Sequence, residues 1–357
     1  MKNNNDLNLM VNNLIKSIFS DALDVSLKNP TNAAFFARTA MAQKKAASIR
    51  QKNEEQGLHV PPVIILSVTN KCNLQCVGCY SRLVPREQKP ELSTANLTSV
   101  LQQASQLGVS IVLIVGGEPL TRQDIFNVTK NFPEMIFYLF TNGTLIDDTV
   151  LRQFKEQRHV IPILSLEGHE NITDLRRGAG VYDWLMKNMA KLHERDIFFG
   201  TSFTVTQSNY ETVMDESFIR SMKKHGCKAF IYIEYNPVME GTEDWVVTDA
   251  QRKEILTKIA TYRASQPGVY ITFPGDEKAF GGCLSSGRGF IHISAFGDVE
   301  TCPFAPYSDS NILDMPLKEA LNSKLFKALR ENHDKLMESN GGCALLKKPE
   351  WVKSLLD

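Results

Sequence analysis

Residues 63–80 read VIILSVTNKCNLQCVGCY, in which a continuous apolar run is followed by Cys72, Cys76 and Cys79. The apolar run predicts a strand buried on both faces, because such strands lack polar alternation. The cysteine spacing, C-x3-C-x2-C, concentrates three thiols on the loop after this strand. Three thiolates on one loop can hold three irons of a four-iron cluster and leave the fourth iron open.

Zinc is the alternative metal for such a loop, because soft thiolates bind both zinc and iron–sulfur clusters. Structural zinc sites usually have four ligands, often arranged as two separated pairs. Here three cysteines fall within eight residues, and no histidine lies in the same loop. The pattern therefore favours an iron–sulfur cluster with an open iron.

Strand and helix patterns alternate on the carboxyl side of this stretch. Six strand–helix units predict an α/β fold with a parallel sheet and helices over its outer face. Six units are too few for a complete eight-unit barrel, so we expect a partial (β/α)6 TIM-like barrel with its active site at the carboxyl ends of the strands. The expected strands are 63–68, 111–115, 136–140, 160–166, 198–205 and 229–234.

Two regions flank this expected core, which we place at 59–274. Residues 1–58 carry helical patterns at 5–28 and 31–55 and predict an N-terminal helical extension that packs on the barrel. A lid over the barrel, or a contact surface for an apolar substrate, is the alternative role. Residues 275–357 combine short strands, one helix and three cysteines, and predict a small α+β domain.

The bulk composition is that of an ordinary globular protein. The chain has 357 residues, 43% of them hydrophobic, and a formal net charge of zero, which gives no electrostatic reason to expect nucleic-acid binding. No segment approaches the roughly 20 apolar residues of a membrane span, and the N-terminus lacks signal-peptide features, so we expect a cytoplasmic protein. Seven cysteines argue against a disulfide framework and favour metal or redox use.

The cysteine loop resembles that of the radical S-adenosylmethionine (SAM) enzymes. Their motif has this spacing and an aromatic residue beside the last cysteine, here Tyr80, and it follows the first strand of a partial barrel. The resemblance implies that Cys72, Cys76 and Cys79 bind a 4Fe–4S cluster whose open iron chelates SAM.

Segments that end the next three expected strands resemble the family's SAM-binding segments. The first, expected to hold the SAM amino group, consists of Gly116, Gly117, Glu118 and Pro119. Glycines permit close backbone approach, and Glu118 offers an anionic acceptor for an ammonium group. An ordinary Gly-Gly turn is the alternative. The candidates near the SAM ribose or methionine are Thr141, Asn142, Ser165 and Glu167.

Arg177 is a candidate partner for the SAM carboxylate, a role that suits a planar guanidinium. A surface salt bridge is its alternative. Glu167 stands where the family more usually has aspartate, so its contact is not transferred from the family.

A second set of thiols comprises Cys283, Cys302 and Cys343. The run from Cys283 through Gly297 to Cys302 resembles the start of the SPASM and twitch extensions of radical SAM enzymes, and implies one auxiliary 4Fe–4S cluster. Its fourth ligand is open between Cys227, a non-cysteine group, and substrate on an open iron. Cys227 also fits a small buried hydrophobic residue.

The resemblance implies an oxygen-sensitive oxidoreductase. Reductive cleavage of SAM would give a 5′-deoxyadenosyl radical that abstracts a hydrogen atom from a peptide or small-molecule substrate. An auxiliary cluster would assist oxidation or anchor substrate, and a flavodoxin or ferredoxin would supply electrons. The alternatives are an iron–sulfur redox sensor or electron carrier without turnover, and a zinc protein.

Overall fold

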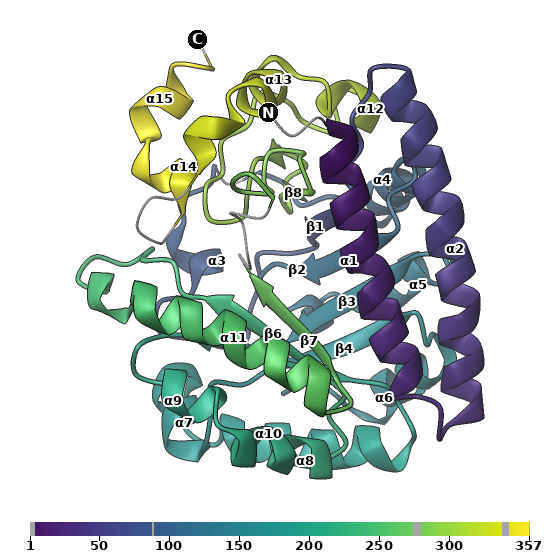
Figure 1. Ribbon diagram of the computed structural model, residues 1–357, viewed down its shortest axis with the longest axis vertical. Helices are drawn as coiled ribbons and strands as arrows, with labels where there is room; N and C mark the ends of the chain where they lie inside the picture. The colour runs from purple at the N-terminus through teal and green to yellow at the C-terminus, as the bar shows by residue number, and fades with distance from the viewer. Residues whose placement is uncertain (1–3, 88, 274–279, 338–342, 357) are drawn as a thin grey trace.

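One sheet runs through the molecule in the strand order β7-β6-β5-β4-β3-β2-β1-β8-β9 (Figure 1). The computed structural model describes residues 4–87, 89–273, 280–337 and 343–356. Strands β1 to β8 are parallel to their neighbours, and β9 is antiparallel to β8. The strands are β1 Val63–Ser67, β2 Ile111–Val115, β3 Ile136–Thr141, β4 Val160–Ser165, β5 Gly200–Val205, β6 Ala229–Glu234, β7 Val269–Phe273, β8 Phe290–Ile293 and β9 Val299–Glu300.

Helices connect these strands and cover the outer face of the sheet. None of the helices in the described ranges is long and apolar enough to cross a membrane. The helices are α1 Asn4–Asp24, α2 Pro30–Glu55, α3 Tyr80–Leu83, α4 Thr94–Leu107, α5 Ile125–Thr129, α6 Asp148–Glu156, α7 Glu170–Arg177, α8 Val181–Glu194, α9 Tyr210–Val213, α10 Glu216–Lys224, α11 Asp249–Ser265, α12 Leu317–Ala320, α13 Lys324–Glu331, α14 Ala344–Lys347 and α15 Pro349–Lys353.

The predicted alternation of strands and helices is confirmed, and the sheet extends beyond it at both ends. β7 follows α11 and pairs with β6. β8 was expected inside a separate C-terminal domain, yet it pairs in parallel with β1, with Val63 opposite Phe290. The sheet thus continues across the expected boundary at residue 275, and the division into domains stays a prediction.

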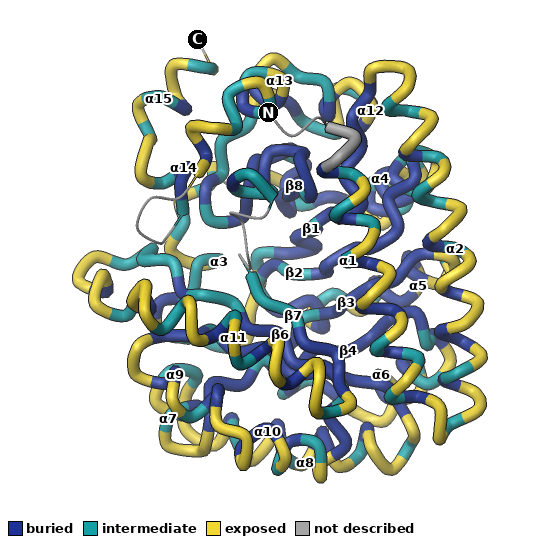
Figure 2. The backbone as a smooth tube through the Cα atoms, viewed as in Figure 1, coloured by how far each residue is buried: buried dark blue, intermediate teal, exposed yellow. Residues whose placement is uncertain are grey.

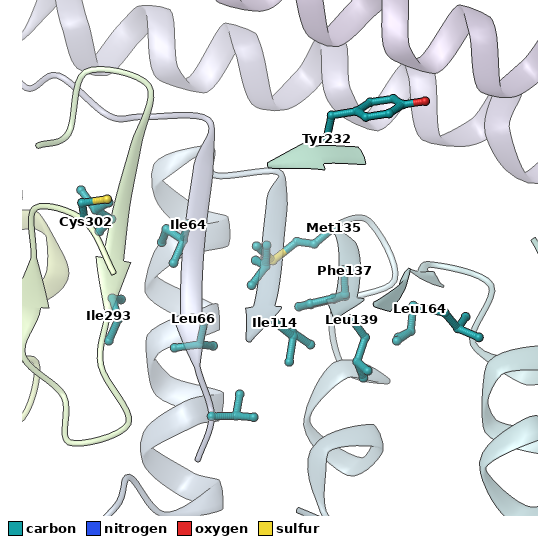
Figure 3. Close-up of a cluster of buried hydrophobic side chains, with 14 of the residues drawn as sticks. Ile64, Leu66, Ile114, Met135, Phe137, Leu139, Leu164, Tyr232, Ile293 and Cys302 are labelled. Carbon is teal, nitrogen blue, oxygen red and sulfur yellow. The ribbon is translucent and has the colours of Figure 1, made fainter. Parts of the chain in front are cut away.

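Side chains along each strand alternate between two hydrophobic cores. On β2, Val112 and Ile114 pack in the larger core with the connecting helices, whereas Ile111 and Leu113 face the other side. Figure 3 shows side chains of the larger core on neighbouring strands, from Ile293 on β8 to Leu164 on β4. Both faces of the strands are therefore buried, as Figure 2 shows, which explains their continuous apolar sequences.

The N-terminal helices close the second core. α1 presents an apolar face that packs with the first residues of the strands, among them Ile111 and Ile136. In Figure 1, α1 crosses in front of the sheet and α2 lies beside it. The expected packing of this extension on the barrel is confirmed. These helices close the amino-terminal end of the barrel, so the carboxyl ends of the strands remain for chemistry. The residues that α1 contributes are Leu7, Val11, Ile15, Ile18, Phe19 and Ala22.

Phe36 on α2 tests this packing. Its side chain is 1% exposed, and its ring meets that of Phe198 edge to face at 4.8 Å. We expect Phe36→Ala to lower the free energy of unfolding by about 3–5 kcal/mol, because it removes a buried ring and leaves a cavity. Met41→Ala on the same helix, where the side chain is 67% exposed, is the control and should change stability by less than about 0.5 kcal/mol. Equal effects in urea unfolding would contradict this role of α2.

Candidate functional site

The cysteine loop lies at the carboxyl end of β1 and is held by neighbouring segments. The Val77 N–H donates to the Arg176 carbonyl, at the end of α7, at 2.9 Å. Asn73 accepts a 2.9 Å hydrogen bond from the Asn142 side chain and donates one of 2.8 Å to the Thr144 hydroxyl. The loop is thus attached to the segments that follow β3 and β4.

The three thiols of the loop differ in exposure. Cys72 is exposed, Cys76 and Cys79 are half-buried, and the Leu74 N–H donates to the Cys72 sulfur at 3.4 Å. Burial raises the pKa of Cys72, and the charges of Glu118, Cys76 and Cys79 raise it further. Among the described residues no three Cys, His, Asp or Glu side chains converge closely enough for one metal ion.

Gly116 and Gly117 are required by close backbone packing against this loop. A Cβ atom would lie 2.2 Å from the Thr69 carbonyl oxygen at Gly116, and 2.2 Å from the Lys71 carbonyl oxygen at Gly117. The Gly117 N–H donates to the Thr69 carbonyl at 2.8 Å. The loops after β1 and β2 therefore touch through backbone atoms alone, which no residue with a side chain permits.

Glu118 is 1% exposed and joins the ends of β2 and β3. Its carboxylate accepts hydrogen bonds from the Leu120 N–H at 3.0 Å, the Thr141 hydroxyl at 2.8 Å and the Asn142 N–H at 2.7 Å. Burial raises its pKa, and these donors and Arg177 oppose that shift. The observed role of this carboxylate is structural, and its expected contact with an ammonium group stays a prediction.

Glu167 is fully buried and forms ion pairs with two arginine side chains. Its Oε1 accepts from Arg176 Nη1 at 2.5 Å, and from Arg177 Nε at 2.8 Å and Nη2 at 2.5 Å. Burial lowers the pKa of Arg177, but Glu167, Cys76 and Cys79 outweigh it and the net shift is upward. Arg177 therefore forms a salt bridge with Glu167, but one whose arginine side chain is only 10% exposed, and its contact with the SAM carboxylate stays a prediction. Two guanidinium groups thus share the Glu167 carboxylate beside the cysteine loop, and the charge of Arg177 also acts on the Glu118 carboxylate.

The remaining candidates lie at the expected strand ends. Ser165 ends β4, and its hydroxyl accepts from Ser202 at 3.4 Å. Thr141 ends β3, and Pro119 begins a short 3-10 turn after β2. The carboxyl edge of the sheet thus collects the first set of candidates in one region.

Tyr80 connects this region with the second set of cysteines. Its ring packs edge to face on that of Phe304 at 4.9 Å, two residues beyond Cys302. Burial raises the Tyr80 pKa, and the charges of Cys79 and Cys302 contribute to the rise. The two cysteine-bearing segments therefore lie against each other.

A buried series of charged, hydrogen-bonded side chains, which was not predicted from the sequence, reinforces this contact. Arg86 donates to both carboxylate oxygens of Glu300 at 2.8 Å. The other partner of Glu300 is His292 Nδ1 at 2.7 Å, and His292 Nε2 lies 2.8 Å from the Ser67 hydroxyl. This series of hydrogen bonds joins β1, β8 and β9. Only the pairing of His292 with Glu300 across a hairpin was accessible from sequence, because it depends on local register.

The cysteines of the second set, Cys283, Cys302 and Cys343, differ in burial. The Ser285 N–H lies 3.5 Å from the Cys283 sulfur, the same residue-plus-two relation that Leu74 has to Cys72. Cys302 is buried after β9, and Cys343 precedes α14.

Cys227 lies apart from both sets. It is 2% exposed in the larger core, where its thiol donates to the Ala229 carbonyl at 3.2 Å and contacts the Thr201 hydroxyl at 3.5 Å. Burial raises the Cys227 pKa to about 12. This position, two residues before β6, agrees with the small buried hydrophobic residue that was one of its two interpretations.

Comparisons with known proteins match part of this chain to a family. Residues 66–227 match the Radical SAM superfamily model. The AdoMet-dependent heme synthase of Methanosarcina barkeri is 25% identical over 319 residues, covering 80% of this chain and 88% of that protein. The mycofactocin maturase MftC of Mycolicibacterium smegmatis is 27% identical over 314 residues, covering 81% and 76%.

Solved structures share the fold. SuiB of Streptococcus suis, bound to the precursor peptide SuiA, superposes with a TM-score of 0.66 at 18% identity, covering 85% of this chain and 76% of that one. The enzyme anSMEcpe with bound AdoMet gives 0.60 at 18% identity, covering 77% and 81%. The predicted partial barrel is thereby confirmed. Members of the superfamily use a 4Fe–4S cluster and SAM. Residues 66–227 thus match a radical SAM domain, and the radical SAM relatives indicate that the protein is an enzyme.

Proposed function

We propose that Cys72, Cys76 and Cys79 hold a 4Fe–4S cluster and that the protein uses it to cleave SAM reductively and abstract a hydrogen atom from a substrate. The observation that carries this proposal is the group of three thiols at the carboxyl edge of the barrel, attached to the segments after β3 and β4. When bound, the cluster and SAM supply a 5′-deoxyadenosyl radical. The protein's part is to orient the reactants and exclude water.

The guanidinium groups of Arg176 and Arg177 would donate to the SAM carboxylate. Glu167 holds both side chains in place, which reduces the cost of ordering them when the ligand binds. Glu118 would act indirectly, because its hydrogen bonds hold Thr141 and Asn142 beside the loop. The backbone of Gly116 and Gly117 would lie against the methionine part.

For the second set we propose one auxiliary 4Fe–4S cluster, held by Cys283, Cys302 and Cys343 in the domain 275–357. The N–H donor to the Cys283 sulfur supports this, because such hydrogen bonds stabilise cluster thiolates. The fourth ligand would be a non-cysteine group or substrate, since Cys227 lies in the core of the barrel. The cluster would assist oxidation or anchor the substrate.

The substrate would be a peptide or a small metabolite such as a tetrapyrrole. Heme synthases and a mycofactocin maturase are among the relatives, which makes both classes candidates. A flavodoxin or ferredoxin would be the electron donor, and the cytoplasm is the compartment that keeps these thiols reduced.

Iron loading separates the two sets of cysteines. After anaerobic reconstitution we expect about eight irons per chain, about four of which are lost in Cys72→Ala together with all SAM cleavage. Cys227→Ala is the matched control and should keep its iron, because that thiol is a core group.

Stoichiometric zinc without visible absorption would contradict the proposal. If both clusters formed but SAM and dithionite gave no 5′-deoxyadenosine, the protein would be a redox sensor or electron carrier. Substrate-stimulated 5′-deoxyadenosine in fractionated extract, followed by mass spectrometry, identifies the substrate.

Gly116→Ala tests the contact between the two loops. The new Cβ would clash with the Thr69 carbonyl, so we expect lower iron content and weaker SAM binding. Gly57→Ala is the control, because Gly57 also has a positive φ, +80°, but open space around its Cβ position. Its cost is that of the left-handed backbone alone, about 1–2 kcal/mol, and it should load iron normally. If Gly116→Ala bound SAM with the wild-type affinity, this segment would not be part of the SAM site.

A further inference from the structure

The segment after β6 folds back over the cysteine loop. The Tyr235 N–H donates to the Val205 carbonyl at 3.0 Å, which continues the sheet by one residue. Further along, the Gln207 N–H donates to the Trp245 carbonyl at 2.9 Å, and the Gln207 side chain donates to the Val246 carbonyl at 2.9 Å. Both ends of this segment are thus fixed to the end of β5.

Two aromatic rings of this segment lie on the loop backbone between Cys76 and Cys79. A Cβ at Gly78 would stand 2.9 Å from the Tyr235 hydroxyl oxygen and 3.2 Å from Cζ3 of Trp245. The two rings lie 5.3 Å apart at 45°. A side chain at position 78 would therefore collide with these rings, and the residue there is a glycine, with φ of +66°.

The ring of Tyr235 is held in this orientation. It is buried, and its hydroxyl lies 2.9 Å from the hydroxyl of Thr242, which in turn donates to the Met239 carbonyl at 2.5 Å. Trp245 is half-buried, and its ring packs against that of Tyr235. A buried, hydrogen-bonded tyrosine packed against a larger ring is a rigid support, because aromatic side chains have few rotamers and bury much area.

We propose that Tyr235 and Trp245 are positioning residues that form an aromatic clamp, which holds the cysteine loop in its cluster-binding conformation and keeps water and oxygen from the cluster. The inference rests on the proposed cluster at Cys72, Cys76 and Cys79. Solvent access controls the stability and potential of iron–sulfur sites, so a ring over this loop acts on the cluster without ligating it.

Air sensitivity of the reconstituted protein tests the shielding. We expect the visible absorption of Trp245→Ala to bleach several-fold faster in air than that of the wild type, and Trp245→Phe to bleach at nearly the wild-type rate. Trp245 emission, taken as the difference between the wild type and Trp245→Phe, should be quenched when iron is loaded. Trp184, exposed on α8, is the control, and its emission should be quenched less. Bleaching of Trp245→Ala at the wild-type rate, or Trp245 emission indifferent to iron, would overturn the proposal.

Proteolysis of the iron-free protein tests the positioning separately. Lys71 is exposed beside Cys72, so trypsin reports directly on this loop. We expect Trp245→Ala and Gly78→Ala to be cut after Lys71 several-fold faster than the wild type, while cleavage after Lys44 on α2 is unchanged. Unchanged cleavage after Lys71 would refute the clamp even if cluster assembly succeeds. Equal iron in the wild type and Cys72→Ala would instead refute the proposed function, and the cleavage rates would still decide on the clamp.

Discussion

Backbone contact between the loops after β1 and β2 is the constraint on which the site depends. The carbonyl oxygens of Thr69 and Lys71 occupy the space that side chains would need at positions 116 and 117. Two hydrogen bonds, from the Gly117 and Glu118 N–H groups to these carbonyls, fix the approach. The cysteine loop therefore starts from a defined position at the strand ends. The attachments of Asn73 and Val77 and the rings at Gly78 hold the remainder of the loop.

Sequence predicted most of the architecture because its determinants are local. Apolar runs at 111–115 and 136–140 and the cysteine spacing are visible without tertiary information. Pairing between distant strands is not visible in this way. β8 was expected within a small C-terminal domain, and its place beside β1 depends on contacts more than 200 residues apart in sequence.

The charged residues show the same division. Glu167 and Arg177 were recognised by position in the motif, but their mutual pairing and the second arginine at 176 came from the structure. Arg86 carries no motif at all, and its carboxylate partner lies 214 residues away. A buried ion pair depends on which elements meet, which no residue spacing encodes. Tyr235 and Trp245 were missed for the same reason, although Gly78 between two cysteines was a sign that something lies close to the backbone there.

The parallel pairing of β1 with β8 has a consequence for how the two cysteine-bearing segments move. β1 leads into the loop with Cys72, Cys76 and Cys79, and β9, which pairs with β8, leads into Cys302. Adjacent strands lie about 4.8 Å apart, a spacing set by backbone geometry. A substitution that shifts β8 along β1 would therefore displace Cys302 relative to the first cysteine loop, even though neither segment is itself part of a strand.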